Sequence, residues 1–294
     1  MKTSKTPTKP VIGVGLRHPH FSEALSGSAA VDFVEVHSEN FFAHGGALHQ
    51  ILNDISEKYP VSLHSTAMGL GSVADIPESY LSQLYTLTEI IQPFLLSDHA
   101  CFAWGQVGDQ FVHAGDLLPI TYNEESLSLM TQRISQIQER LGQRLLIENL
   151  SAYLTMPGST FSEKEFLLLL VERTQCGLLI DLNNLLVNAY NKMPSAATDN
   201  HLETTKSWLQ DIPSSAVGEI HLAGYQTPSG DDMAVDDHSQ PVSALGWELY
   251  AYALNLFGSI PTLIEWDNQL PDWNTLIAQA HEARSIALKV LNDE

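Results

Sequence analysis

Gly177-Leu178-Leu179-Ile180-Asp181 and the earlier segment Arg144-Leu145-Leu146-Ile147-Glu148 share one pattern, in which three apolar residues end abruptly in a carboxylate. Three apolar residues in a row are typical of a parallel strand that is buried on both faces. An ionised carboxylate at the end of such a strand is costly unless it is paired, hydrogen-bonded or bound to a metal. The two segments therefore predict parallel strands that end in a functional polar site.

The pattern recurs along the chain, and it predicts the fold. Apolar runs also end in His64, in Asp98-His99, in His221 and in Glu265. Strands are expected at 11–17, 32–37, 61–64, 94–97, 144–148, 177–181, 217–221 and 261–265, and helices at 21–30, 45–59, 77–91, 123–141, 162–173, 199–209, 244–257 and 273–291. Eight alternations within 294 residues are typical of a (β/α)₈ TIM barrel in a single domain.

Two segments are expected to be irregular. Residues 103–122 are too polar for a helix, and a loop of that length inside a compact domain is usually functional. A loop carrying Asn183, Asn184 and Tyr190 is expected after the sixth strand.

Composition excludes several classes of function. The apolar fraction of 44% is enough for a large core, and the formal charge of −21 argues against nucleic acid or an anionic membrane as partner. Residues 1–10 form a polar leader with three lysines and lack the hydrophobic region of a signal peptide, so residues 11–294 are assigned to the barrel and the protein to the cytoplasm. Cys101 and Cys176 are too few for a disulfide framework.

The polar strand ends provide the ligand types of a metal centre. In TIM barrels the reactive groups lie at the carboxyl ends of the strands, where these side chains fall. Mixed imidazole and carboxylate ligation suits iron, manganese or zinc, and nine candidates are more than one ion needs. The predicted ligands are His64, His99, Glu148, Asp181, Asn184, His221, Asp236, His238 and Glu265. Glu148 is the predicted carboxylate bridge between ions.

Residues next to these ligands supply the other candidates. Asp267 follows shortly after Glu265 and is a candidate acid or base, with orientation of a histidine as an equally good role. Glu39, Asn40 and Asn149 are candidates for lining a substrate channel, and the role of His37 is ambiguous.

The motifs together resemble the multinuclear non-haem iron-dependent oxidases, a bacterial family that includes the methanobactin biosynthetic oxidase. The resemblance covers most of the chain and rests on separated motifs in the right order. They are Gly13-Val-Gly-Leu-Arg17, Glu35-Val-His-Ser-Glu-Asn40, Ser97-Asp-His99, Ile147-Glu-Asn149, Asp181-Leu-Asn-Asn184, Ile220-His-Leu-Ala-Gly224, Asp236-Asp-His238 and Leu263-Ile-Glu-Trp-Asp267. At position 237 this chain has Asp where the family pattern has Thr.

This resemblance implies a TIM barrel that holds two or three iron ions in a mixed-valent Fe²⁺/Fe³⁺ centre on the nine ligands above. It further implies that dioxygen is the co-substrate, that cysteine residues of a ribosomally made precursor peptide are oxidised, and that a partner protein binds the peptide leader.

Two other interpretations remain open at this point. A divalent-metal TIM-barrel enzyme of the sugar isomerase or endonuclease-like kind places similar ligands at its strand ends and activates water or shifts a proton. A metal-binding or scaffold subunit without turnover is the third, although such a role does not require ligands gathered at the open end of a barrel.

Overall fold

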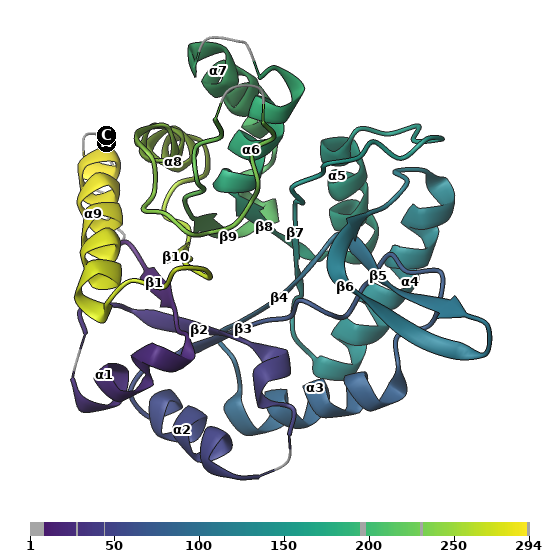
Figure 1. The fold of residues 1–294 in the computed structure, drawn as a ribbon, viewed down its shortest axis with the longest axis horizontal. Coiled ribbons are helices and arrows are strands. Elements are labelled where there is room, and N and C mark those ends of the chain that lie inside the picture. The colour runs from purple at the N-terminus through teal and green to yellow at the C-terminus, as the bar shows by residue number, and fades with distance from the viewer. Residues whose placement is uncertain (1–8, 28, 44, 195–197, 230–231, 293–294) are drawn as a thin grey trace, which may run out of the picture.

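The computed structural model describes residues 9–27, 29–43, 45–194, 198–229 and 232–292. The expected polar leader therefore lies outside the described residues except for its last two. Eight parallel strands close into a barrel, and helices surround it (Figure 1). The prediction of a single-domain TIM barrel is confirmed.

The barrel strands follow one another around the ring in chain order. They are β1 (Ile12–Gly15), β2 (Phe33–His37), β3 (Val61–His64), β4 (Leu95–His99), β7 (Leu146–Glu148), β8 (Gly177–Asp181), β9 (Val217–Leu222) and β10 (Thr262–Ile264), and β10 pairs with β1. Most barrel-strand residues are buried, as the continuous apolar runs predict.

The outer layer contains α1 (Phe21–Ser26), α2 (Ala47–Ser56), α3 (Glu78–Ile91), α4 (Glu124–Leu141), α5 (Glu163–Thr174), α6 (Leu182–Lys192), α7 (Thr198–Leu209), α8 (Ala244–Phe257) and α9 (Trp273–Asn292), with short 3₁₀ turns at His18–His20, Ser38–Phe41 and Ser214–Ala216. Helix starts follow local sequence signals. The Asn123 side chain accepts from Ser126 N at α4, and Ser162 and Glu165 form a capping box at α5.

Strand register brings the polar ends to one level. His37 lies opposite His64, His99 opposite Glu148, and Asp181 opposite His221 in neighbouring strands. These pairs lie at the carboxyl ends of β2, β3, β4, β7, β8 and β9. The register therefore gathers imidazoles and carboxylates at one end of the barrel.

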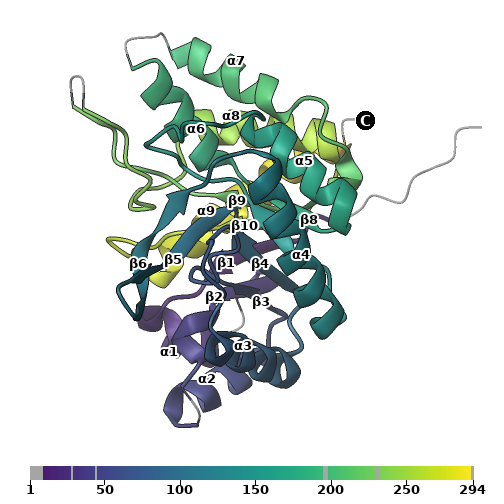
Figure 2. The same cartoon turned by 90° about the vertical axis from the view of Figure 1, so that its right-hand side faces the viewer.

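The prediction that residues 103–122 are irregular is wrong over most of that segment. Its residues up to 119 belong to an antiparallel hairpin of β5 (Cys101–Val107) and β6 (Gln110–Pro119). Most of β6 is exposed on both faces, so its sequence lacks the alternation that marks a half-buried strand. In Figure 2 the hairpin lies on the same side of the barrel as the segment that follows β9.

The prediction of a loop around Asn183, Asn184 and Tyr190 is also wrong, because these residues belong to α6. Asp181 caps this helix by accepting a 2.5 Å hydrogen bond from Asn184 N. Leu182, Leu185 and Leu186 are buried within the helix. Among the described residues, no helix is long and apolar enough to cross a membrane.

Candidate metal centre

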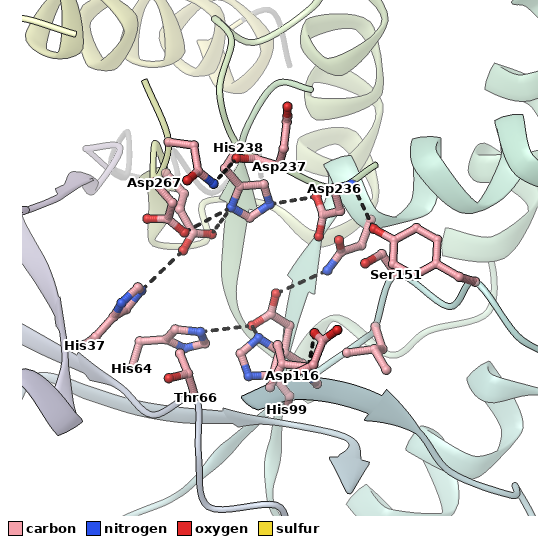
Figure 3. Close-up of a pocket in the computed structure, with 17 residues that line it drawn as sticks. His37, His64, Thr66, His99, Asp116, Ser151, Asp236, Asp237, His238 and Asp267 are labelled. Carbon is pink, nitrogen blue, oxygen red and sulfur yellow. Dashed lines mark hydrogen bonds and ion pairs between the residues drawn. The ribbon is translucent and has the colours of Figure 1, made fainter. Parts of the chain in front are cut away.

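A cavity of about 180 Å³ opens at the carboxyl ends of the strands (Figure 3). His64 and His99 lie on one side of it, and Asp236 and His238 on the opposite side. The hairpin, which the sequence interpretation missed, contributes Asp116 and Leu117 of β6 to the wall.

Most of the predicted ligands come together at this cavity. Seven of the nine line it, namely His64, His99, Glu148, Asn184, Asp236, His238 and Glu265. The other two, Asp181 and His221, are fully buried at neighbouring positions of β8 and β9. The predicted ligand set is therefore divided between the cavity wall and the layer beneath it.

The first metal-capable group joins β3, β4 and β7. Glu148 Oε2 lies 3.4 Å from His64 Nε2 and 3.1 Å from His99 Nε2. Ser97 Oγ lies 2.7 Å from His64 Nδ1 and fixes that ring. Burial lowers the pKa of His99 to about 4, and burial with the neighbouring His99 and His221 lowers the pKa of His64. Both imidazoles are therefore neutral near pH 7, the form that binds metals.

The second group joins Glu148 to Asp181 and His221, whose ligand atoms lie within 4.8 Å of one another. Asp181 uses Oδ1 to cap α6, which leaves its buried Oδ2 without a hydrogen-bond partner among the described residues. Burial raises the pKa of Asp181 to about 7 and the pKa of Glu148 well above its usual range. Asn184 Nδ2 donates to Asn149 O at 3.0 Å, whereas Asn184 Oδ1 is buried and accepts no hydrogen bond from the residues that the structure describes.

The third group contains Asp181, His238 and Glu265. His238 Nδ1 lies 3.4 Å from Glu265 Oε2, and its Nε2 lies 2.8 Å from Asp236 Oδ1. Asp237 organises this loop, because its carboxylate accepts from Ser239 Oγ at 2.7 Å and from Ser239 N at 3.3 Å. His238 adopts a left-handed backbone, with φ of 43°, which costs about 1–2 kcal/mol for a residue with a side chain.

These groups fit metal ions better than they fit a metal-free protein. Buried oxygens without a hydrogen-bond partner are costly, and Asp181 Oδ2 and Asn184 Oδ1 have none in the part of the chain that the structure describes, while Glu148 Oε2 faces the imidazoles of His64 and His99. Glu148 and Asp181 each belong to two of the groups. The shared carboxylates are suited to bridging neighbouring ions, and oxygen with imidazole donors suits iron, manganese or zinc.

Asp267 lies at the rim and has both oxygens engaged. Its Oδ1 accepts from Arg17 Nε at 2.7 Å, and its Oδ2 lies 3.4 Å from His238 Nδ1. Burial and Glu265 raise the pKa of Asp267, but Arg17 and His238 outweigh them and hold it below its usual range. The geometry gives more direct support to orientation of His238 than to proton transfer.

The three proposed channel residues lie elsewhere. Glu39 accepts from Thr66 N and Ala67 N, both at 2.9 Å, and Asn40 is exposed. Asn149 is fully buried, donates to Asp181 O at 3.0 Å and accepts from Asp181 N at 2.9 Å. The lining of the cavity includes none of the three, so their role in a substrate channel stays a prediction.

Sequence reasoning missed two buried acids, Glu35 of β2 and Glu219 of β9. His221 Nδ1 lies 3.0 Å from Glu265 Oε2, while His221 Nε2 lies 3.5 Å from Glu35 Oε2 and 3.8 Å from Glu219 Oε1. A ligating histidine commonly donates its other N–H to a carboxylate. The alternation of β2 and β9, which points these side chains inward, was the available signal.

Glu35→Gln is expected to weaken metal binding by roughly 10–100-fold, the usual cost of losing such a partner. The measurement is competition with a chelator of known affinity. Asp32→Asn is the control, because Asp32 is tied to Ile12 N and Arg284 outside the cavity. Equal affinities for Glu35→Gln and the parent protein would contradict this role.

Metal affinity is expected to rise between about pH 6 and pH 8, because the ligands must lose protons to bind a metal. Asp181 loses its proton near pH 7, and the pKa of His221 is raised because Glu35 and Glu265 outweigh its burial. Deprotonation of both favours the metal-bound form as pH increases. Calorimetry in buffers of different ionisation enthalpy should detect proton release, and a pH-independent affinity would contradict the expectation.

The closed barrel and its buried imidazole and carboxylate groups define a TIM-barrel protein with side chains able to bind metal ions at its strand ends. The chain belongs to the family of the RiPP precursor modification enzyme MbnB/TglH/ChrH, whose model matches residues 11–288. It is therefore a member of an enzyme family that modifies precursor peptides.

Relatives with the family name UPF0276 protein support the assignment. One from Anaeromyxobacter sp. (strain Fw109-5) is 39% identical over 279 residues, covering 95% of this chain and 93% of the relative. Another from Vibrio vulnificus (strain CMCP6) is 40% identical over 285 residues, covering 96% of this chain and 94% of the relative.

Solved structures share the fold at low identity. A xylose isomerase domain containing protein from Salmonella typhimurium has a TM-score of 0.63 and 12% identity, with 97% of this chain and 100% of that chain covered. Endonuclease IV from Thermus thermophilus has a TM-score of 0.58 and 15% identity, with 95% of this chain and 99% of that chain covered. These likenesses bear on the fold alone.

Proposed function

We propose that this protein is a multinuclear iron-dependent oxidase that uses dioxygen to modify cysteine residues of a ribosomally made peptide. The observation that carries the proposal is the sharing of Glu148 and Asp181 between adjacent metal-capable groups. Family membership supports the peptide substrate. We further propose that the protein holds two or three iron ions in a mixed-valent state. A partner protein is proposed to bind the leader of the peptide.

The proposed ligands divide between the groups according to distance. His64, His99 and Glu148 would hold one ion, and Glu148, Asp181 and His221 would hold a second. Asp181, His238 and Glu265 provide a third position, with Asn184 and Asp236 nearby. Iron bound by these residues would supply one-electron redox chemistry toward dioxygen and a thiolate.

The protein's own residues position and isolate the reacting groups. Ser97 holds the His64 ring through Nδ1, and Glu35 faces His221 Nε2 at 3.5 Å, which leaves His221 Nδ1 on the side of Glu265. Asp267 is retained as a proposed acid or base, with orientation of His238 as its alternative role. The thiol must come from the peptide, because Cys101 and Cys176 are both fully buried and burial raises the pKa of each.

Oxygen uptake tests this function. Protein purified without oxygen and loaded with ferrous iron is expected to consume dioxygen with a cysteine-bearing precursor peptide and to change the peptide mass. Zinc-loaded protein is the control and should do neither. Activity with zinc or manganese in the absence of oxygen would instead favour a divalent-metal enzyme of the sugar isomerase or endonuclease-like kind.

A further inference from the structure

One metal-capable group at the cavity rim already contains a cation from the chain itself. The ligand atoms of His37, Glu265 and Asp267 lie within 4.8 Å of one another. Arg17, two residues beyond β1, reaches all three. Its Nε donates to Asp267 Oδ1 at 2.7 Å, and its Nη2 lies 2.9 Å from His37 Nε2 and 3.4 Å from Glu265 Oε1.

The backbone of β1 makes room for this arrangement. A Cβ added at Gly15 would lie 3.3 Å from Arg17 Nη1 and 3.5 Å from the central guanidinium carbon. Arg17 is only 8% exposed, so its guanidinium is enclosed by the same acids that it contacts. Glycine at position 15 therefore allows a buried guanidinium to fold back toward the cavity.

A guanidinium has hydrogen-bond donors only, so its contact with His37 requires that Nε2 of that ring is the acceptor. His37 Nε2 must accept from Arg17, and its lone pair is then not free to bind a metal. Glu265 is similarly divided, with Oε1 toward Arg17 and Oε2 toward His221 and His238. Arg17 thus determines which oxygen of Glu265 faces the inner groups.

We propose that Arg17 is the resident cation of the His37–Glu265–Asp267 group, that it excludes a metal ion there, and that it confines the metal centre to the inner groups. Arg17 is a positioning residue in this account, because it acts through Glu265 and Asp267. The inference rests on the metal-binding part of the proposed function and does not depend on the peptide or on oxygen.

Metal counting on the intact protein tests this role. Arg17→Met keeps a similar side-chain length without charge, and after anaerobic loading with Co²⁺ it should bind one more ion per chain than the parent protein by elemental analysis. Arg17→Lys retains a cation and should keep the parent number. Arg284→Met removes an arginine paired with Asp32 at 2.7 Å, outside the cavity, and is the matched control.

A second variant keeps the test decisive if Arg17→Met does not fold. His37→Phe in the parent protein should leave the number of bound Co²⁺ ions unchanged, whereas loss of an ion would make His37 a ligand and overturn the inference. The same or a lower count in folded Arg17→Met would also overturn it. Parent protein that binds no metal at all would instead contradict the metal centre of the proposed function.

Discussion

Glu148→Gln is expected to abolish binding at two of the metal-capable groups and to lower oxidase activity by roughly 100-fold or more, beyond the usual cost of losing a ligand's supporting partner. Glu148 faces His64 and His99 in one group and shares a second group with Asp181 and His221. Elemental analysis after anaerobic iron loading and the rate of oxygen uptake measure the two effects.

The same substitution should stabilise the metal-free protein against unfolding, although it weakens metal binding. Burial raises the pKa of Glu148 well above its usual range, so the acid is costly to bury when no cation is bound. Metal-free Glu148→Gln is therefore expected to melt about 2–4 °C above metal-free parent protein, equivalent to roughly 1 kcal/mol.

Glu163→Gln is the matched control for this pair of measurements. Desolvation also raises the pKa of Glu163, but its carboxylate accepts from Leu150 N at 3.0 Å and lies outside the ligand groups. This variant should retain the parent metal content. Full metal content in the Glu148→Gln variant would contradict the proposal that Glu148 bridges two ions.

Removal of the metal ions is expected to lower the melting temperature by on the order of 10 °C for each ion removed. A ligand at roughly 1,000 times its Kd stabilises the folded state by about 4 kcal/mol per site. For a chain of this size, about 1 kcal/mol corresponds to roughly 2–4 °C. Scanning calorimetry before and after chelation measures the shift, and readdition of Fe²⁺ should reverse it.

Glu148→Gln provides the comparison for the chelation experiment, because its melting temperature should respond much less to added metal. An identical melting temperature for the loaded and chelated parent protein would mean that the buried acids are not compensated by cations.

The barrel was predictable because its strands carry a strong local signal. Apolar runs such as 177–180 are typical of buried parallel strands, and the observed β8 (Gly177–Asp181) matches the expected range. The hairpin was not predictable by the same reasoning, because β6 is mostly exposed and its polar residues resemble those of a loop. Helix α6 was missed because Asn183 and Asn184 were interpreted as loop residues, with Asn184 as a ligand, although Asp181 caps the helix.

The candidate site was only partly accessible from sequence. Strand ends identified the histidines and acids, since the carboxyl ends of parallel strands meet at one mouth. The contacts of Arg17 with Glu265 and Asp267 join residues up to 250 positions apart, and no local pattern predicts them. The left-handed backbone of His238 likewise depends on the surrounding loop contacts.

A crystal structure of anaerobically prepared, iron-replete protein, with diffraction measured on both sides of the iron absorption edge, tests the central claim most directly. Anomalous density is expected between His64, His99 and Glu148, and again between Glu148, Asp181 and His221. A mouth without iron, with Glu148 and His221 turned away from each other, would contradict the proposed metal centre.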